Sequence, residues 1–104
     1  MARHGLRLHP GRVLREEYME PLHLSEADLA AALDVPQERL HAILEPEATR
    51  VFPAAINSDF ALRLARCLGT SPQFWLNLQA AHDLSVTQAM LGAEIEARVR
   101  PMAA

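Results

Sequence analysis

Residues 25–44, SEADLAAALDVPQERLHAIL, hold two short helical patterns with a break between them. Ser25 suits a helix N-cap, because its hydroxyl can accept a hydrogen bond from the backbone N–H of Asp28. The break falls at residues 34–36, where a proline ends one helix and can begin the next at residues 37–44. Two short helices joined by a tight turn indicate either a helix-turn-helix or an ordinary helical hairpin in a bundle.

Helical patterns continue on both sides of this pair. Each begins at a proline, serine or asparagine and stops at a proline or glycine, and together they cover residues 10–20, 58–68 and 71–91. Beyond them, Ile95 and Val99 are four residues apart and predict one further short helix or a partner-facing segment. The chain is rich in alanine and leucine, which favour helices over strands. The predicted fold class is therefore all-α, with five helices and a helical C-terminal extension.

Composition places the chain among globular proteins. It has 104 residues, close to the commonest domain size, and it is 50% hydrophobic and 22% charged, which argues against a disordered chain. No apolar run approaches the roughly 18 residues that a membrane span needs, and the N-terminus lacks the apolar stretch of a signal peptide. A single cysteine, Cys67, excludes an intramolecular disulfide. We expect a cytoplasmic protein.

Charge is unevenly distributed along the chain. The net charge of −3 is weak evidence against a nucleic-acid partner, but all ten basic residues are arginines and several lie near the N-terminus. Between residues 16 and 48 there are nine carboxylates and a single arginine, Arg39. The predicted organisation is a basic arm at 1–8, a helix-turn-helix domain at 9–84 and an extension at 85–104, expected to mediate dimerisation or partner binding.

Two longer motifs make the sequence familiar. HPGRVLREEYMEPL at 9–22 and ALRLARCLGTSPQFWLNLQ at 61–79 flank the helix pair, and over residues 9–84 the chain closely resembles the HigA-type antitoxins, an XRE-like helix-turn-helix family. The resemblance implies a five-helix, λ-repressor-like domain that dimerises largely through its C-terminal helices. It also implies binding to an operator upstream of its own operon. A further implied partner is a HigB-type toxin, an endoribonuclease that cleaves messenger RNA on the ribosome.

Candidate DNA contacts lie on the second helix of the pair and around it. Arginine can pair bidentately with guanine or phosphate, and glutamine or histidine side chains can hydrogen-bond a base or phosphate. The N-terminus of a helix, here at Ser25, often meets a phosphate, although Ser25 also has a purely local role as a cap. A solvated helix face is the alternative for the others. The candidates are Ser25, Gln37, Glu38, Arg39, His41, Arg50, Arg3 and Arg7.

The segment EPEATRVFP, residues 45–53, departs from the resemblance. HigA-type proteins usually carry a short basic loop of the NGKRRI kind here, whereas this longer loop begins with two glutamates. The exposed face of helix 37–44 is expected to centre on Glu38, Ala42 and Glu45. Carboxylates repel phosphate, although glutamate can accept a hydrogen bond from cytosine N4. Two readings stay open: an autorepressing antitoxin, or a toxin-binding or adaptor module with weak or lost DNA binding.

Apolar side chains near the C-terminus predict an interface with a dimer mate or partner protein. Tryptophan is a frequent anchor of such interfaces. The candidates are Trp75, Leu78, Ile95 and Val99, although ordinary core packing is the better reading of Leu78. Zinc-ligand spacings, paired catalytic carboxylates and glycine-rich phosphate loops are all lacking in the sequence. We therefore expect no enzymatic activity, no catalytic or metal site and no cofactor.

Overall fold

The chain is all-α, as the sequence predicts. The structure, a computed structural model, describes residues 9–47 and 54–102, and no strand occurs among them. Its elements are α1 Pro10–Val13, a π-helix η1 Leu14–Met19, α2 Glu26–Leu33, α3 Gln37–Leu44, α4 Ser58–Leu68 and α5 Pro72–Arg98. None of the helices in these described ranges combines the length and apolar character needed to cross a membrane.

Side-chain caps fix where most of the helices begin. The first N–H groups of a helix have no partner within it, so a preceding side chain that accepts from them stabilises the start. Four such caps are present: His9 to the N–H of Gly11 at 2.9 Å, Ser25 to Asp28 at 3.0 Å, Asn57 to Phe60 at 2.9 Å and Ser71 to Phe74 at 3.1 Å. The sequence-predicted helix starts at 10, 26, 58 and 72 are thereby confirmed.

The first helix becomes a π-helix after one α-helical turn, a change that the sequence does not predict. From Leu14 to Met19 it is a π-helix, and the N–H of Glu20 still donates to the carbonyl of Arg15, five residues back, at 2.9 Å. Residues five apart lie on different faces of an α-helix with about 3.6 residues per turn, but they come close to alignment in the wider π turn. As a result Leu14 and Met19 are both buried in the core.

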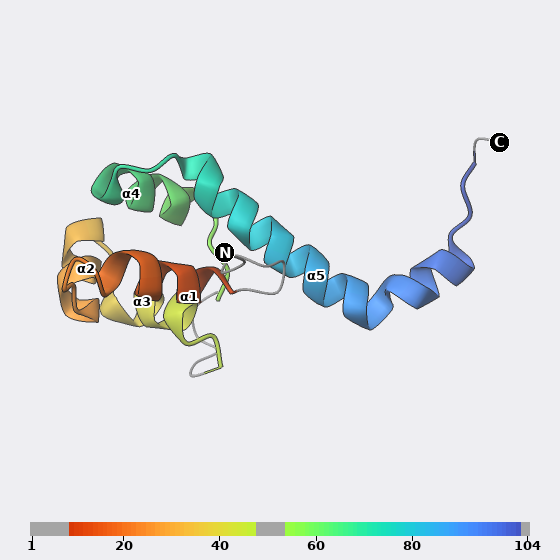
Figure 1. Cartoon of the computed structure of the whole chain (residues 1–104), viewed down its shortest axis with the longest axis horizontal. Coiled ribbons are helices and arrows are strands. Elements are labelled where there is room, and N and C mark those ends of the chain that lie inside the picture. Colours follow the sequence, from red (N-terminus) through yellow and green to blue (C-terminus); the bar gives the residue numbers. More distant parts are fainter. Residues whose placement is uncertain (1–8, 48–53, 103–104) are drawn as a thin grey trace.

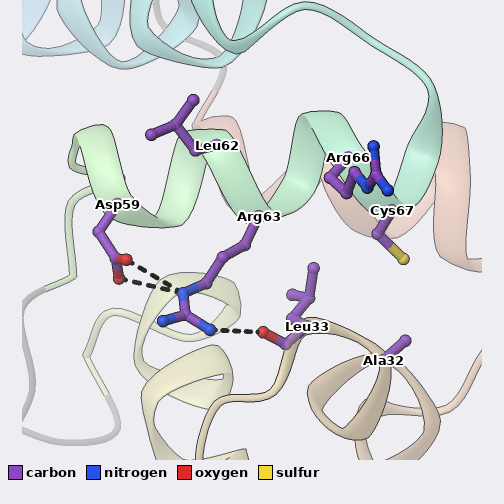
Figure 2. Close-up of a pocket in the computed structure, with 7 residues that line it drawn as sticks. All are labelled: Ala32, Leu33, Asp59, Leu62, Arg63, Arg66 and Cys67. Atoms are coloured by element: carbon purple, nitrogen blue, oxygen red, sulfur yellow. Dashed lines mark hydrogen bonds and ion pairs between the residues drawn. The ribbon is translucent and has the colours of Figure 1, made fainter.

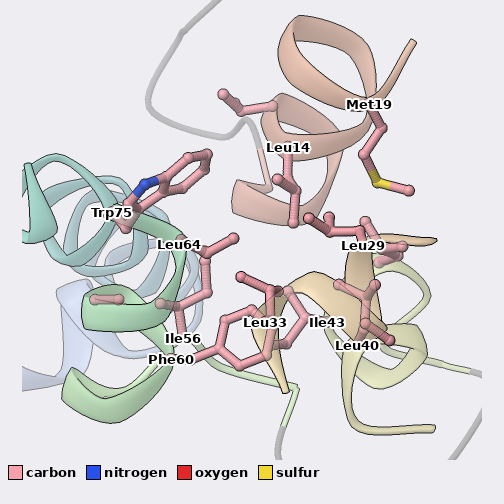
Figure 3. Packing of buried hydrophobic residues seen from close by; sticks show 14 residues of the cluster. Leu14, Met19, Leu29, Leu33, Leu40, Ile43, Ile56, Phe60, Leu64 and Trp75 are labelled. Carbon is pink, nitrogen blue, oxygen red and sulfur yellow. The ribbon is translucent and has the colours of Figure 1, made fainter. Parts of the chain in front are cut away.

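The core lies where the elements meet, and Figure 3 shows large side chains of η1, α2, α3, α4 and α5 converging on it. Trp75 is completely buried, and its indole N–H donates to the hydroxyl of Thr70 at 2.7 Å. The prediction of Trp75 as an interface anchor is therefore wrong, because its side chain packs against Tyr18 and Phe74 inside the chain. Leu78 is partly buried against the same cluster, in keeping with core packing.

The first helix approaches α3 very closely at Gly11. A side-chain carbon on Gly11 would collide with the backbone carbonyl of Ile43. Only glycine lets the two backbones come this near, so the small residue at position 11 sets the distance between α1 and α3.

The last helix is longer than the sequence predicts. The expected end near Leu91 is wrong: α5 runs unbroken from Pro72 to Arg98, so Ile95 lies within it and Val99 just beyond it. Of the two alternatives for these residues, a separate short helix is therefore excluded. The segment is rich in helix-forming alanine, and its one breaker, Gly92, costs only about 1 kcal/mol in a helix. The first half of α5 packs on α4 and α1, whereas the second half extends away from the other helices (Figure 1).

Candidate nucleic-acid interface

A tight left-handed turn joins α2 to α3. Asp34 has φ 58° and ψ 49°, a conformation that aspartate tolerates better than most residues. The N–H groups of Asp34 and Val35 donate to the carbonyls of Ala31 at 3.2 Å and Ala30 at 3.1 Å, which satisfies the end of α2. Val35 is partly buried against the core. The turn therefore holds α3 at a fixed angle to α2, as the predicted helix-turn-helix requires.

Arg63 on α4 ties this turn down from outside. Its guanidinium donates to the carbonyls of Leu33 at 2.9 Å and Asp34 at 3.0 Å, and its Nε donates to Asp59 at 3.1 Å. Figure 2 shows Arg63 reaching from α4 to the end of α2, across a groove of about 350 Å³. An arginine near the last carbonyls of a helix stabilises that end. The helix-turn-helix is thus fastened to α4.

One face of α3 is buried and its beginning is exposed. Leu40, Ile43 and Leu44 lie in the core, whereas Gln37 and Glu38 are exposed, as predicted. The prediction that Ala42 lies at the centre of the exposed face is wrong, because Ala42 is completely buried. A methyl group extends little beyond the helix surface, so longer neighbouring side chains can exclude water from it.

Arg39 is paired with residues of α4 and its N-cap at the surface instead of projecting freely. Its guanidinium lies 2.8 Å from the carboxylate of Asp59, donates to Asn57 at 3.4 Å and sits 5.2 Å from the centre of the Phe60 ring. A hydrogen bond from Arg39, and to a smaller extent one from Arg63, lowers the pKa of Asp59, so this carboxylate is charged at neutral pH. Arg39 therefore joins α3 to α4, a role that its place on the helix does not indicate.

Four charged or titratable residues form a connected group at the other side of α3, here named the Arg15 network. Arg15 on η1 contacts the carboxylates of Glu45 at 3.1 Å and Glu26 at 3.4 Å through the same nitrogen, Nη2. The Nδ1 atom of the His41 imidazole also lies 3.0 Å from the carboxylate of Glu26. Glu45, at the start of the acidic loop, and Glu26 thus share one cation, Arg15, which compensates part of the negative charge on this face.

Comparisons with known proteins identify the family. No protein-family profile matches the chain. Virulence-associated protein I of Dichelobacter nodosus is 42% identical over 81 residues, which are 78% of this chain and 69% of that protein. A solved addiction module antidote protein of a HigA family from Coxiella burnetii is 41% identical, with a TM-score of 0.80 over 91% of this chain and 97% of that one.

The chain belongs to the HigA family of antitoxins. Another member, the Pseudomonas aeruginosa antitoxin HigA, has been solved with the higBA promoter. It is 35% identical to this chain and superposes with a TM-score of 0.83 over 93% of this chain and 99% of its own length. The helix-turn-helix fold and the family resemblance predicted from the two flanking motifs are therefore confirmed.

The remaining predicted residues of this HigA-family chain fall into three groups. Ser25 is the N-cap of α2, as predicted. Ile95 and Val99 are 48% and 65% exposed, so both are available to a partner. Arg3, Arg7 and Arg50 lie outside the described residues. Arg15 and Glu26 are site residues that sequence reasoning missed. Because their partners are 11 and 30 residues away in the chain, no local spacing indicates the contacts.

A histidine pair joins the start of this HigA-family fold to α5. The rings of His9 and His82 meet edge to face with centroids 4.8 Å apart, and Nδ1 of His82 is buried with no partner among the described residues. Burial, and to a smaller extent His82, lower the pKa of His9, while Asp83 acts in the opposite direction. The folded chain therefore favours neutral His9.

The lowered pKa of His9 predicts that acid destabilises the fold. Below the ordinary histidine pKa of about 6.5, the unfolded chain takes up a proton more readily than the folded one, so stability is lost as pH falls through the folded pKa. We expect the urea midpoint to decrease between about pH 7.5 and pH 5, and to decrease less in His82→Gln. His23→Asn, which replaces an exposed histidine, is the control. Equal pH dependence in all three proteins would contradict the assignment.

Proposed function

We propose that this chain is an antitoxin that binds operator DNA as a homodimer, represses its own operon and neutralises a HigB-type endoribonuclease toxin. The observation that carries the proposal is the helix-turn-helix itself: α3 is fastened to α2 and α4, and its first residues are exposed. Membership of the HigA family supports the same function, since the Pseudomonas aeruginosa member was solved with a promoter.

The exposed start of α3 suits base recognition. In helix-turn-helix domains the second helix enters the major groove with its N-terminal residues toward the base edges. Gln37 can pair bidentately with adenine, and Glu38 can accept a hydrogen bond from cytosine N4. Backbone N–H groups at the start of α2, next to Ser25, suit a phosphate. Arg3, Arg7 and Arg50 remain proposed DNA contacts on charge alone.

The exposed half of α5 suits the dimer contact. Leu84, Leu91 and Ile95 are 71%, 44% and 48% exposed, and their spacings of seven and four residues place them on one side of the helix. Val99 continues this side just after the helix ends. In the described part of the chain no other element covers this apolar stripe. Packing the stripes of two chains together would bury both and hold two recognition helices in one dimer.

A second candidate function is a toxin-binding module with weak DNA binding. Phosphate neutralisation by arginine and lysine supplies most non-specific DNA affinity. On α3, the cation Arg39 is engaged with Asp59, and His41 contacts Glu26. This pairing favours the second candidate over tight operator binding, while the fold would still present surfaces to a protein partner.

Fluorescence anisotropy of the purified chain with its own upstream promoter and with a scrambled duplex, at several salt concentrations, separates the two functions. Operator recognition predicts a preference for the promoter of at least about 10³-fold, with affinity falling steeply as salt rises. Equal, weak binding to both duplexes would contradict operator binding and favour the second candidate. Co-purification with the toxin encoded beside the gene tests neutralisation separately, and failure to form that complex would contradict the antitoxin role.

A further inference from the structure

We propose that Arg15 contacts a DNA phosphate and that Glu45 competes with the DNA for it, which makes the Arg15 network a control on affinity. This inference rests on the proposed operator binding and adds a contact residue outside the helix-turn-helix. The arginine belongs to η1, whereas base recognition is assigned to α3.

The position of Arg15 supports a contact with DNA. Arg15 contacts Glu45 at the end of α3 and Glu26 in the first turn of α2, and Glu26 links it to His41 on α3. The start of α2 and the exposed side of α3 are the two parts of a helix-turn-helix that face DNA and its phosphates. Arg15 therefore lies beside the proposed DNA-facing surface, and its side chain is 34% exposed.

The bonding of the Arg15 guanidinium supports competition between Glu45 and a phosphate. Carboxylate and phosphate oxygens present similar acceptors to a guanidinium, so Glu45 occupies the kind of contact that a phosphate would make. Both carboxylates meet a single nitrogen of Arg15, Nη2, whereas a guanidinium carries five N–H donors. If Glu45 is released, Nη2 keeps only the longer contact with Glu26, so a phosphate oxygen can take the place of the Glu45 carboxylate.

The ion pair between Arg15 and Glu45 is weak enough to be exchanged. Glu45 is 54% exposed, and ion pairs between exposed side chains contribute little to stability because water screens them. A phosphate contact, in contrast, also releases a counterion from the DNA, which is favourable at low salt. Exchange of Glu45 for phosphate is therefore easy, and the strength of the carboxylate contact sets how much affinity is gained.

Substitutions in the full chain test this competition by anisotropy with the promoter and scrambled duplexes over a salt series. Arg15→Gln is expected to weaken binding to both duplexes about three- to tenfold and to reduce the salt slope by about 1.8, the value of two phosphates, one for each protomer of the proposed dimer. The control is Arg12→Gln, since Arg12 is also a helix-face arginine paired with one carboxylate, Glu16. That control should keep the wild-type slope.

The competition itself is tested by Glu45→Gln, which is expected to strengthen binding about three- to fivefold. Glu47→Gln removes the same charge two residues further along and should give a smaller gain. In Arg15→Gln/Glu45→Gln the gain should disappear. Thermal unfolding of each variant checks that it is folded.

The outcomes separate this inference from the proposed function. A wild-type preference for the promoter, together with Arg15→Gln matching Arg12→Gln, would overturn the role of Arg15 and leave operator binding in place. A gain in Glu45→Gln that persists without Arg15 would show general charge repulsion and overturn the competition. If the wild-type chain shows no promoter preference, the proposed function and this inference both fail.

Discussion

Replacing Trp75 with alanine is expected to destabilise the folded chain by about 3–5 kcal/mol, a large fraction of the roughly 5–15 kcal/mol by which native domains are stable. The indole is completely buried and lies where η1, α4 and α5 meet, and its N–H has a partner in Thr70. Truncation would leave a cavity in the densely packed interior and an unpaired hydroxyl. Chemical denaturation monitored by circular dichroism measures the loss.

Two further variants separate packing from hydrogen bonding at this site. Trp75→Phe keeps much of the apolar volume but loses the contact with Thr70, so a cost of about 1–3 kcal/mol is expected. Leu62→Ala removes a side chain that is 60% exposed and should change stability by less than about 0.5 kcal/mol. If Trp75→Ala were no more costly than Leu62→Ala, the placement of Trp75 in the core would be contradicted.

The second large effect is expected on α5. In the proposed dimer, Leu91→Asp/Ile95→Asp would place two carboxylates in each copy of an apolar contact, where unpaired charges are strongly disfavoured. We expect the dimer dissociation constant to rise by at least about 100-fold, equivalent to roughly 2.7 kcal/mol. Sedimentation equilibrium measures this directly, and operator affinity should fall with it because the two recognition helices no longer act together.

Met90→Asp is the matched control for the α5 variant. Met90 is 75% exposed and precedes Leu91 by one residue, which turns it about 100° away from the apolar stripe. Its substitution adds one carboxylate per chain, against two in Leu91→Asp/Ile95→Asp, and should leave the dimer intact. If Met90→Asp dissociated the dimer as strongly, or if the wild-type chain sedimented as a monomer, the stripe would not be the contact.

Much of the fold could be predicted from sequence because caps and breakers are local signals. Ser25, Asn57 and Ser71 each bond to an N–H three residues on, so the starts of α2, α4 and α5 are encoded within one helical turn. The π-helix and the length of α5 were missed for the opposite reason. The π-helix has no distinctive residue at its start, and α5 continues through Gly92 and ends three residues before Pro101.

The candidate site was less predictable because its contacts join distant parts of the chain. On an isolated helix Arg39 would be free to contact DNA. Its partner Asp59 lies 20 residues later in the chain and reaches it only once α4 is folded into place. Glu45 looked like a repulsive charge for the same reason, since its partner Arg15 is 30 residues earlier. Trp75 shows that a large aromatic side chain gives no sign by itself of whether a core or a partner covers it.

The unbroken course of α5 has a consequence for how the proposed dimer would fit DNA. One end of the helix lies in the core beside the helix-turn-helix and the other carries the apolar stripe, so in the proposed dimer the helix would act as a spacer between the recognition surface and the twofold axis. Each residue added or removed within it would change that spacing by about 1.5 Å and turn the stripe by about 100°. Half-site separation in the operator would therefore be encoded in the length of α5, far from any residue that contacts a base.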